Sequence, residues 1–477
     1  MTGTPVTASS PMTIHDAVEA ADLRVLVLCI YHLTGDQRWL GERFAPARDV
    51  RLVADPEAGF NAETKAEIRS AAVDLLTGGQ GAGAVEVPEP VVTDPDPGQF
   101  RRMMSFCLGE PVPDEYVPMI LDDFGFTSED ARWTDGSPPP RPSDPAVDHE
   151  VLIIGAGVSG MCLGIKLDRL AIPWTIIEKN PEVGGTWHEN RYPGCGVDTP
   201  NHFYSYSFAP NPAWRRYFSQ RDELHAYLQN CATEFDLRSR IRFSTIMTAA
   251  RWEEEHARWR VSLIDGDGVA TETTTRILVS ATGHFNQPMA ARFPGDEEFE
   301  GRIVHTARWP DDLDLAGAEV AVIGTGASSV QLVPTIAPIA ARVTVYQRTP
   351  QWVRPTENYN GEVDPRSSWL FANLPFYGKW YRFAQFWRYG DGLLRYLRRD
   401  PDWPHPERAM NGVNDRHRIE MTEHIVDSLA SKPELVDGCI PSYPPFGKRI
   451  LLDNDWYATL CRSNVDLVTE TIERFDA

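Results

Sequence analysis

Two glycine-rich segments have the residue types and spacing of turns that bind the pyrophosphate of a dinucleotide. Each follows a short apolar run, at 151–154 and at 320–323. In a G-x-G-x-x-G turn the first glycine permits the tight turn, the second lets the backbone approach the phosphates, and the third lets the helix pack closely on its strand. The N–H groups that begin the helix then face the anion. The candidate phosphate-binding residues are Gly155, Gly157 and Gly160 in the first turn, and Gly324, Gly326 and Ser329 in the second.

The residue about 20 positions after each first glycine indicates which nucleotide would bind. Glu178 occupies this place in the first unit and Arg348 in the second. A carboxylate can accept hydrogen bonds from ribose hydroxyls, whereas a guanidinium can bind a ribose 2′-phosphate through two hydrogen bonds. We therefore expect the first unit to hold FAD or NAD and the second to prefer NADPH. The alternatives are turns that only pack a helix on a sheet and a solvated surface arginine.

The elements around these turns form two strand–helix–strand units. The first runs from the strand 151–154 through a helix to about residue 170 and the strand 174–177. The second runs from the strand 320–323 through a helix to about residue 340 and the strand 343–346. Short continuous apolar runs are typical of buried parallel strands. The sequence thus predicts an α/β fold with two Rossmann-like dinucleotide-binding domains.

Residues ahead of the first turn have a helical pattern instead. Thr13 and Asp16 form a capping-box pattern, Asn61 can begin a helix that ends near Leu76, and a third helix is expected around 100–108. The proline-rich run 136–142 is expected to be a linker. We expect four regions: an N-terminal helical extension (1–145), an FAD-binding domain (146–310), an NADPH-binding domain (311–450) with a helical insertion at about 355–440, and a return into an incomplete FAD domain (451–477).

Composition excludes several other classes of protein. The 46 Lys and Arg residues against 68 Asp and Glu residues give a net charge of −22, which argues against nucleic acid as a partner. No apolar run reaches the roughly 18 residues of a membrane span, and the N-terminus lacks the pattern of a secretory signal. The seven cysteines are scattered and never spaced C-x-x-C, so we expect no disulfide framework, no metal site and a cytoplasmic location.

Two dinucleotide units in one chain favour either a disulfide reductase or a flavin monooxygenase. A disulfide reductase needs a redox pair of cysteines close to the first unit, but Cys162 and Cys195 each stand alone. Just before the second unit lies the pattern Phe299-x-Gly301-x-x-x-His305-x-x-x-Trp309-Pro310. With this fingerprint the chain resembles the type I Baeyer–Villiger monooxygenases. We expect His305 to have a structural role between the nucleotide domains more readily than a role in proton transfer.

Further segments resemble the same family. The resemblance implies that Gly185, Thr186, Trp187 and Tyr204 lie on the flavin side, that Asp198 is an active-site aspartate, that Lys448 meets the NADPH phosphate, and that Arg449 lies over the flavin. The long N-terminal extension and the segment 201–208 are most similar to the 4-hydroxyacetophenone monooxygenase group. Simpler readings are that Asp198 caps a turn and that Arg449 is a surface charge.

The resemblance implies an activity that uses FAD, NADPH and O₂ to insert one oxygen atom beside a ketone carbonyl, giving an ester, with an aryl ketone as the expected substrate. A fixed cation such as Arg449 would stabilise negative charge on the reacting oxygen atoms, and Asp198 could orient it. The alternatives are a flavin-containing monooxygenase that oxygenates nitrogen or sulfur, and a truncated, non-catalytic protein that binds nucleotides or dimerises.

Two expectations concern the ends and the insertion. The sequence stops at Ala477, before the family's final FAD-domain segment, so we expect a truncated chain, a partner that supplies the rest, or an inactive protein. We also expect the N-terminal extension to support a homodimer. The stretch 369–403 is aromatic and locally basic, which fits either a helical subdomain of the NADPH domain or a helix at a membrane surface.

Overall fold

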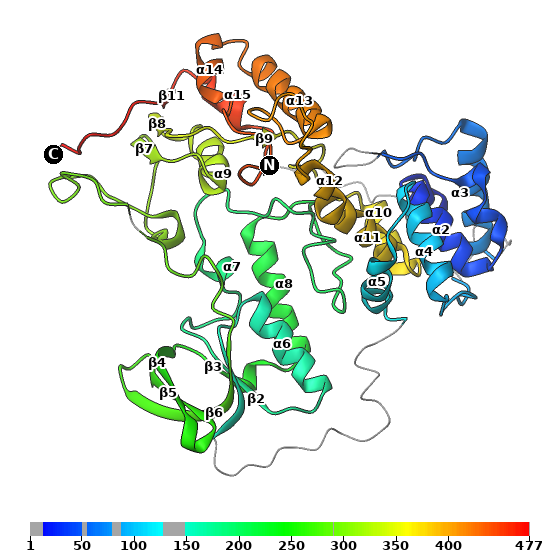
Figure 1. Ribbon diagram of the computed structural model, residues 1–477, viewed down its shortest axis with the longest axis horizontal. Coiled ribbons are helices and arrows are strands. Elements are labelled where there is room, and N and C mark those ends of the chain that lie inside the picture. The colour runs from blue at the N-terminus through cyan, green and yellow to red at the C-terminus, as the bar shows by residue number, and fades with distance from the viewer. Residues whose placement is uncertain (1–12, 50–54, 79–86, 127–147, 290, 477) are drawn as a thin grey trace, which may run out of the picture. The chain divides into compact units, whose positions relative to one another are not determined.

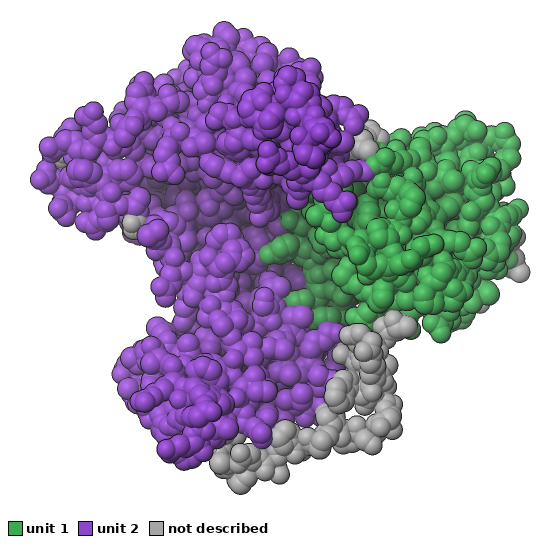
Figure 2. Space-filling model, in the orientation of Figure 1, with its two compact units in different colours: residues 1–128, 199–217, 360–394 green, residues 129–198, 218–359, 395–477 purple. Residues whose placement is uncertain are grey.

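The computed structural model describes residues 13–49, 55–78, 87–126, 148–289 and 291–476 (Figure 1). The expected linker at 136–142 lies outside these residues. The chain divides into two compact units, coloured separately in Figure 2. Unit 1 contains residues 1–128, 199–217 and 360–394, and unit 2 contains residues 129–198, 218–359 and 395–477.

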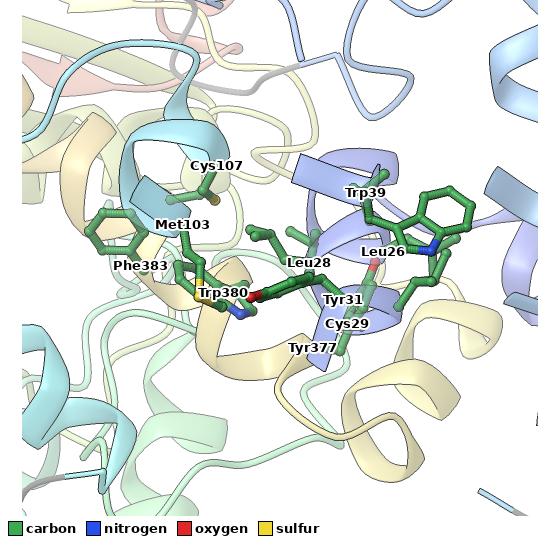
Figure 3. Packing of buried hydrophobic residues seen from close by; sticks show 14 of the residues in the cluster. Leu26, Leu28, Cys29, Tyr31, Trp39, Met103, Cys107, Tyr377, Trp380 and Phe383 are labelled. Atoms are coloured by element: carbon green, nitrogen blue, oxygen red, sulfur yellow. The ribbon is translucent and has the colours of Figure 1, made fainter. Parts of the chain in front are cut away.

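Unit 1 is helical. Its helices come from the N-terminal extension and from a segment near residue 370, and they comprise α1 (Ile14–Glu19), α2 (Leu23–Thr34), α3 (Ala62–Leu76), α4 (Pro97–Leu108), α5 (Val117–Phe124), α10 (Pro365–Asn373) and α11 (Tyr377–Tyr389), with the 3-10 turns η1 (Gln37–Leu40), η2 (Glu42–Phe44), η3 (Asp114–Tyr116) and η8 (Asp391–Leu393). Figure 3 shows Met103 of α4, Leu28 of α2 and Trp380 of α11 projecting into a shared interior.

The expected N-terminal helices are confirmed, and local residues explain where they begin and end. Thr13 and Asp16 form the predicted reciprocal capping box at the start of α1. Asn61 accepts a hydrogen bond from the Thr64 N–H at 2.9 Å and begins α3, which ends at Leu76 as predicted. Helix α4 begins at Pro97 and ends at Leu108, and the C-cap residue Gly109 has a φ of 65°, which glycine adopts readily.

The expected helical insertion is divided between the two units. Helices α10 and α11 share their core with the N-terminal helices, whereas α13 (Gly412–Ser428) belongs to unit 2. The reason is the aromatic face of α11: the Trp380 ring centroid lies 4.7 Å from that of Phe124 and 5.5 Å from that of Phe100. Trp380 and Phe383 are buried, so these aromatic side chains pack in a protein core.

Unit 2 contains the first predicted strand–helix–strand unit within a six-stranded sheet of order β3-β2-β1-β6-β5-β4. Strands β1, β2 and β3 pair in parallel, β6 is parallel to β1, and β4, β5 and β6 form antiparallel pairs. The elements are β1 (His149–Ile154), α6 (Val158–Arg169), β2 (Trp174–Ile177), α7 (Thr186–Glu189), α8 (Arg221–Glu234), η5 (Arg238–Arg240), β3 (Ile241–Arg242), β4 (Ile246–Glu253), η6 (Glu254–His256), β5 (Arg258–Ile264), β6 (Ala270–Ser280) and η7 (Thr306–Arg308).

The second predicted unit forms a three-stranded parallel sheet of order β11-β8-β7 (Figure 1). Its elements are β7 (Glu319–Ile323), α9 (Ala327–Ile336), β8 (Arg342–Tyr346) and β11 (Val465–Val468). Around it lie β9 (Val353–Arg354), α12 (Leu394–Leu397), η9 (Pro433–Leu435), α14 (Val436–Cys439), β10 (Leu451–Leu452) and α15 (Trp456–Leu460). The α/β fold with two Rossmann-like units is confirmed.

The segment after residue 450 differs from its expected return into the FAD domain. Strand β11 pairs with β8, in a register that places Val465 opposite Val343, and β10 pairs with β9. Val465 and Val343 are fully buried, and Asn464 donates hydrogen bonds to the carbonyls of Ala337 and Ala340. Residues 451–468 therefore extend the second nucleotide unit. Within the described residues, no helix is long and apolar enough to cross a membrane.

Substituting Trp380 tests the shared core of unit 1. Trp380→Ala should lower the free energy of unfolding by about 3–5 kcal/mol, because it leaves a cavity among packed aromatic rings. Trp380→Phe should cost less. Met119→Ala, at a 49% exposed position on α5, is the matched control and should change stability little. Urea unfolding followed by circular dichroism measures the difference, and equal effects of Trp380→Ala and Met119→Ala would contradict this packing.

Candidate functional site

The first glycine turn is closely packed. Gly155 has a φ of 108° and its N–H donates to the Ile177 carbonyl at 2.8 Å. A Cβ atom at position 160 would lie 1.9 Å from the Gly155 oxygen, so only glycine fits there. Gly157 is the N-cap of α6. The three glycines thus hold the start of α6 against the ends of β1 and β2, which is the arrangement that presents a helix N-terminus to a pyrophosphate.

Glu178, the residue after β2, also stabilises this turn. Its side chain is buried, and it accepts hydrogen bonds from the backbone N–H groups of Ala156 at 2.7 Å and Asn180 at 2.8 Å. An ionised carboxylate has about four acceptor positions, so these two bonds leave room for ribose hydroxyls. The sequence pattern indicated a ribose ligand but gave no sign that Glu178 also fixes the turn.

The segment that contains Gly185, Thr186 and Trp187 lies against the first glycine turn. The Gly184 N–H donates to the Ala156 carbonyl at 3.0 Å, and a Cβ atom at position 185 would lie 3.1 Å from the Gly157 Cα atom. Thr186 is exposed where α7 begins, whereas Trp187 is buried. The structure therefore brings Gly185 and Thr186 to the turn and gives Trp187 a place in the core.

Asp198 and Arg449 are in direct contact. An Arg449 Nη atom donates to an Asp198 carboxylate oxygen, although the two residues are 251 positions apart. The Asp198 side chain is 13% exposed and that of Arg449 is 64% exposed. Burial raises the pKa of Asp198, and the Arg449 guanidinium opposes this rise. The carboxylate therefore orients a guanidinium whose outer side is open, and the role of this pair beside a flavin stays a prediction.

The loop that carries Asp198 is attached to the second nucleotide unit. Tyr192 donates its hydroxyl hydrogen to Gln331 Oε1 at 2.8 Å, and Gln331 Nε2 donates to the Gly196 carbonyl at 3.0 Å. Gln331 lies on α9, the helix that begins at the second glycine turn. This contact couples the Asp198 loop to that turn. Sequence reasoning missed Gln331, because a glutamine in a helix has no motif of its own.

The second glycine turn is more open than the first. Gly324 has a φ of 104° and its N–H donates to the Tyr346 carbonyl at 2.9 Å. A Cβ atom at Gly324 or at Gly326 would have nothing within 4 Å, so there is space beside the start of α9 for an anionic group. Ser329 is buried at the position of the third glycine. These features fit a dinucleotide pyrophosphate at the N-terminus of α9.

Arg348 is exposed and is the second residue after β8, which ends at Tyr346. Its neighbours are fixed on both sides: Gln347 Nε2 donates to the Gly438 carbonyl at 2.7 Å, and Thr325 Oγ1 donates to the Thr349 carbonyl at 3.1 Å. Thr325 belongs to the second glycine turn. Lys448 is exposed too, and its Nζ atom lies 5.1 Å from the Tyr443 ring centroid. Two cationic side chains are thus carried by well-anchored segments of the second unit.

The fingerprint residues have mostly structural contacts. The Phe299 ring packs edge-on against Phe475 with centroids 5.7 Å apart, and a Cβ atom at Gly301 would lie 2.4 Å from the Phe299 ring. His305 Nδ1 accepts a hydrogen bond from the Ala307 N–H at 3.1 Å, which caps the turn η7 before the half-buried Trp309 and Pro310.

Arg308, which the fingerprint leaves unspecified, joins this segment to the first unit. Its Nη1 atom lies 3.1 Å from Glu189 Oε2, at the end of α7. Lys179 lies 2.7 Å from the other Glu189 oxygen. Although burial raises the pKa of Glu189, hydrogen bonds from Lys179, Asn180 and Arg308 hold it below its ordinary value. The ion pairs therefore connect the fingerprint, α7 and the end of β2.

Tyr204 belongs to unit 1, and its flavin contact stays a prediction. Its N–H donates to the Pro200 carbonyl at 2.8 Å, and Arg382 Nη1 donates to the carbonyls of Phe203 and Ser205 on either side. Among the described residues no group of His, Cys, Asp and Glu side chains could hold a metal ion. All seven cysteines are free thiols.

Comparisons with known proteins agree with this geometry. Residues 152–376 match the model of the pyridine nucleotide-disulphide oxidoreductase family. An uncharacterised monooxygenase of Sinorhizobium fredii is 38% identical over 97% of this chain and 68% of its own length. A Baeyer–Villiger monooxygenase of Streptomyces coelicolor is 38% identical over 67% of this chain and 58% of its own length. The chain thus spans 58–68% of these two relatives.

A solved structure gives the same result. The structure of OTEMO in complex with FAD and NADP has a TM-score of 0.57 and 27% identity, and the match covers 69% of this chain and 68% of that chain. Two parallel strand–helix–strand units with glycine turns define an oxidoreductase fold with two dinucleotide-binding units. Together with these relatives, they show that the chain belongs to the family of FAD-binding Baeyer–Villiger monooxygenases.

Alanine substitutions at the two turns should differ in their effect on stability. Gly160→Ala should destabilise unit 2 strongly, because the new Cβ atom would collide with the Gly155 carbonyl. Gly326→Ala should leave stability nearly unchanged, because the space around position 326 is open, and should weaken binding of a nicotinamide dinucleotide by filling that space. Thermal unfolding and nucleotide titration measure the two effects. Equal loss of stability in both variants would contradict the difference in packing.

Proposed function

We propose that this protein is an FAD- and NADPH-dependent Baeyer–Villiger monooxygenase, which inserts one oxygen atom of O₂ beside a ketone carbonyl to give an ester. The observation that carries the proposal is the Asp198–Arg449 pair, attached through Gln331 to the helix of the second glycine turn. The names of the relatives, which include Baeyer–Villiger and FAD-binding monooxygenases, support the same activity.

The residues around the first turn would hold FAD, and those around the second would hold NADPH. The start of α6 would receive the FAD pyrophosphate, and Glu178 would accept hydrogen bonds from the adenosine ribose. The start of α9 would receive the NADPH pyrophosphate, with Arg348 and Lys448 beside the 2′-phosphate. When bound, these cofactors supply hydride transfer and the activation of oxygen. The protein supplies binding, orientation and electrostatic stabilisation.

Arg449 would stabilise negative charge on the reacting oxygen atoms. A guanidinium held in place before the reaction needs no reorganisation during it, and its effect is greatest where water is excluded. The Asp198 side chain is 13% exposed and accepts a hydrogen bond from one Nη atom of Arg449. A guanidinium has five N–H groups, so others would be available to a substrate oxygen. Asp198 thus acts on the chemistry through Arg449.

The finer assignments follow from the resemblance alone. We infer an aryl ketone as the substrate class and a close relationship to the 4-hydroxyacetophenone monooxygenase group. We also infer a cytoplasmic protein whose N-terminal helical extension supports a homodimer. A flavin-containing monooxygenase that oxygenates nitrogen or sulfur is the second candidate, since such enzymes share the two dinucleotide units. The Trp309-Pro310 ending of the fingerprint favours the first candidate.

Product analysis tests the reaction. With FAD, NADPH and O₂, acetophenone should give phenyl acetate, detected by gas chromatography with mass spectrometry. Arg449→Ala should lower kcat about 100-fold or more, because the charge at the reacting oxygen is lost. Arg449→Lys should recover only part of the rate, because an ammonium cannot reproduce the guanidinium geometry. Arg251→Ala, an exposed position on β4, is the control.

Two results would contradict the proposed reaction. Sulfoxidation of thioanisole without an ester from any ketone would favour the flavin-containing monooxygenase. A purified protein that takes up no flavin, with no yellow absorbance after incubation with FAD, would favour a non-catalytic nucleotide-binding protein.

Arg348→Ala tests the choice of nicotinamide nucleotide. The variant should raise the KM for NADPH roughly tenfold, the size expected for losing charged hydrogen bonds to a phosphate, and should change the KM for NADH little. Arg342→Ala is a matched control. Arg342 is also exposed, lies at the start of β8, the strand before Arg348, and forms an ion pair with Asp466. Steady-state kinetics with both nucleotides give the comparison, and equal changes for NADPH and NADH would refute the role of Arg348.

A further inference from the structure

We propose that Tyr443 is a positioning residue that sets the preference for the 2′-phosphorylated nucleotide, by fixing Lys448 relative to the chain that follows Arg348. This inference rests on the proposed binding of NADPH at the second glycine turn. Tyr443 belongs to no glycine turn and to no part of the fingerprint. Its side chain nevertheless contacts both of the segments that supply positive charge to the second unit.

The hydroxyl group of Tyr443 is attached to the segment that follows Arg348. It donates to the Pro350 carbonyl at 2.9 Å and lies 3.3 Å from Gln351 Oε1. Pro350 is only two residues after Arg348, so this contact limits how far the backbone beside Arg348 can move. Burial raises the pKa of Tyr443, whose hydroxyl, like that of any tyrosine, is protonated and able to donate at neutral pH.

The ring of Tyr443 lies next to Lys448. The Lys448 Nζ atom is 5.1 Å from the ring centroid, within the range of a cation–π interaction. Gly447 lets the chain pass close to the ring, because a Cβ atom there would lie 3.0 Å from Tyr443 Cδ2. The same side chain therefore holds the ammonium group at one face and the Pro350 carbonyl at its hydroxyl end.

The backbone around Tyr443 is also held by hydrogen bonds. Its carbonyl accepts hydrogen bonds from Trp352 Nε1 at 3.0 Å and from Arg418 at 3.4 Å. Two residues later, the Pro445 carbonyl accepts a hydrogen bond from Asn414 of α13 at 3.0 Å. Trp352 and Asn414 are fully buried. The loop before Lys448 thus has little freedom to change the position of the Tyr443 ring.

The residue between Arg348 and Pro350 is attached to the second glycine turn, because Thr325 Oγ1 donates to the Thr349 carbonyl at 3.1 Å. Thr349 and Pro350 are consecutive, so one contact joins Arg348 to the pyrophosphate site and the next joins it to Lys448 through Tyr443. A 2′-phosphate carries up to two negative charges and suits two cations. Fixing these cations in advance lowers the entropic cost of binding.

Two small ligands allow the contribution of the 2′-phosphate to binding to be measured separately from that of the rest of the nucleotide. The FAD-loaded protein is titrated calorimetrically with 2′,5′-ADP and with 5′-AMP, which differ only in that phosphate. Tyr443→Phe removes the hydroxyl contact and should weaken 2′,5′-ADP roughly three- to tenfold, with 5′-AMP unchanged. Tyr443→Leu also removes the π face beneath Lys448 and should weaken 2′,5′-ADP further.

Matched variants make each outcome informative. Tyr227→Phe on α8 removes a tyrosine hydroxyl elsewhere in unit 2 and should alter neither ligand. If Arg348→Ala weakens 2′,5′-ADP while both Tyr443 variants bind it normally, the positioning role is refuted and the nucleotide assignment stands. If Arg348→Ala has no effect either, the NADPH assignment itself fails. Equal weakening of both ligands in the Tyr443 variants would show a general structural role and overturn the inference.

Discussion

The contact on which the proposed chemistry depends is the ion pair between Asp198 and Arg449. A guanidinium can stabilise charge in a reaction only if it is held at one place, and a long exposed side chain loses entropy when it is held. Here a buried carboxylate holds it. The loop that carries Asp198 is in turn anchored by the contacts of Gln331 with Tyr192 and with the Gly196 carbonyl, so the geometry of a single cation depends on contacts in both nucleotide units.

The glycine turns of the two nucleotide units differ in how tightly they are packed. In the first, the glycine turn is packed so tightly that no side-chain atom fits at Gly160, and a buried glutamate braces it. In the second, the turn faces open space, the third glycine is a serine, and the neighbouring cations are exposed. The first turn therefore has less freedom to change its backbone position than the second.

The parts of this structure that sequence could predict are those set by neighbouring residues. The capping box at Thr13 and the strand–turn–helix order at Gly155 depend on a few adjacent side chains, and both are confirmed. Residues whose role comes from distant contacts escaped prediction: Gln331 acts on a loop 135 positions away, and Tyr443 on Pro350, 93 positions away. The aromatic and basic pattern of 369–403 fitted either a helical subdomain of the NADPH domain or a helix at a membrane surface, and it gave no sign that α11 packs with the N-terminal helices.

The pairing of β11 with β8 also affects how the chain matures. Strand β8 is complete when residue 346 leaves the ribosome, but its partner at 465–468 emerges only after more than a hundred further residues. Throughout that interval one side of β8 presents unpaired backbone groups, which is the kind of surface that recruits unwanted strands. Strand β1 of the first nucleotide unit has a similar wait, because β1 ends at residue 154 and its partner β6 begins only at residue 270. In both units, therefore, a strand next to the glycine turn stays unpaired on one side until a distant part of the chain has been synthesised.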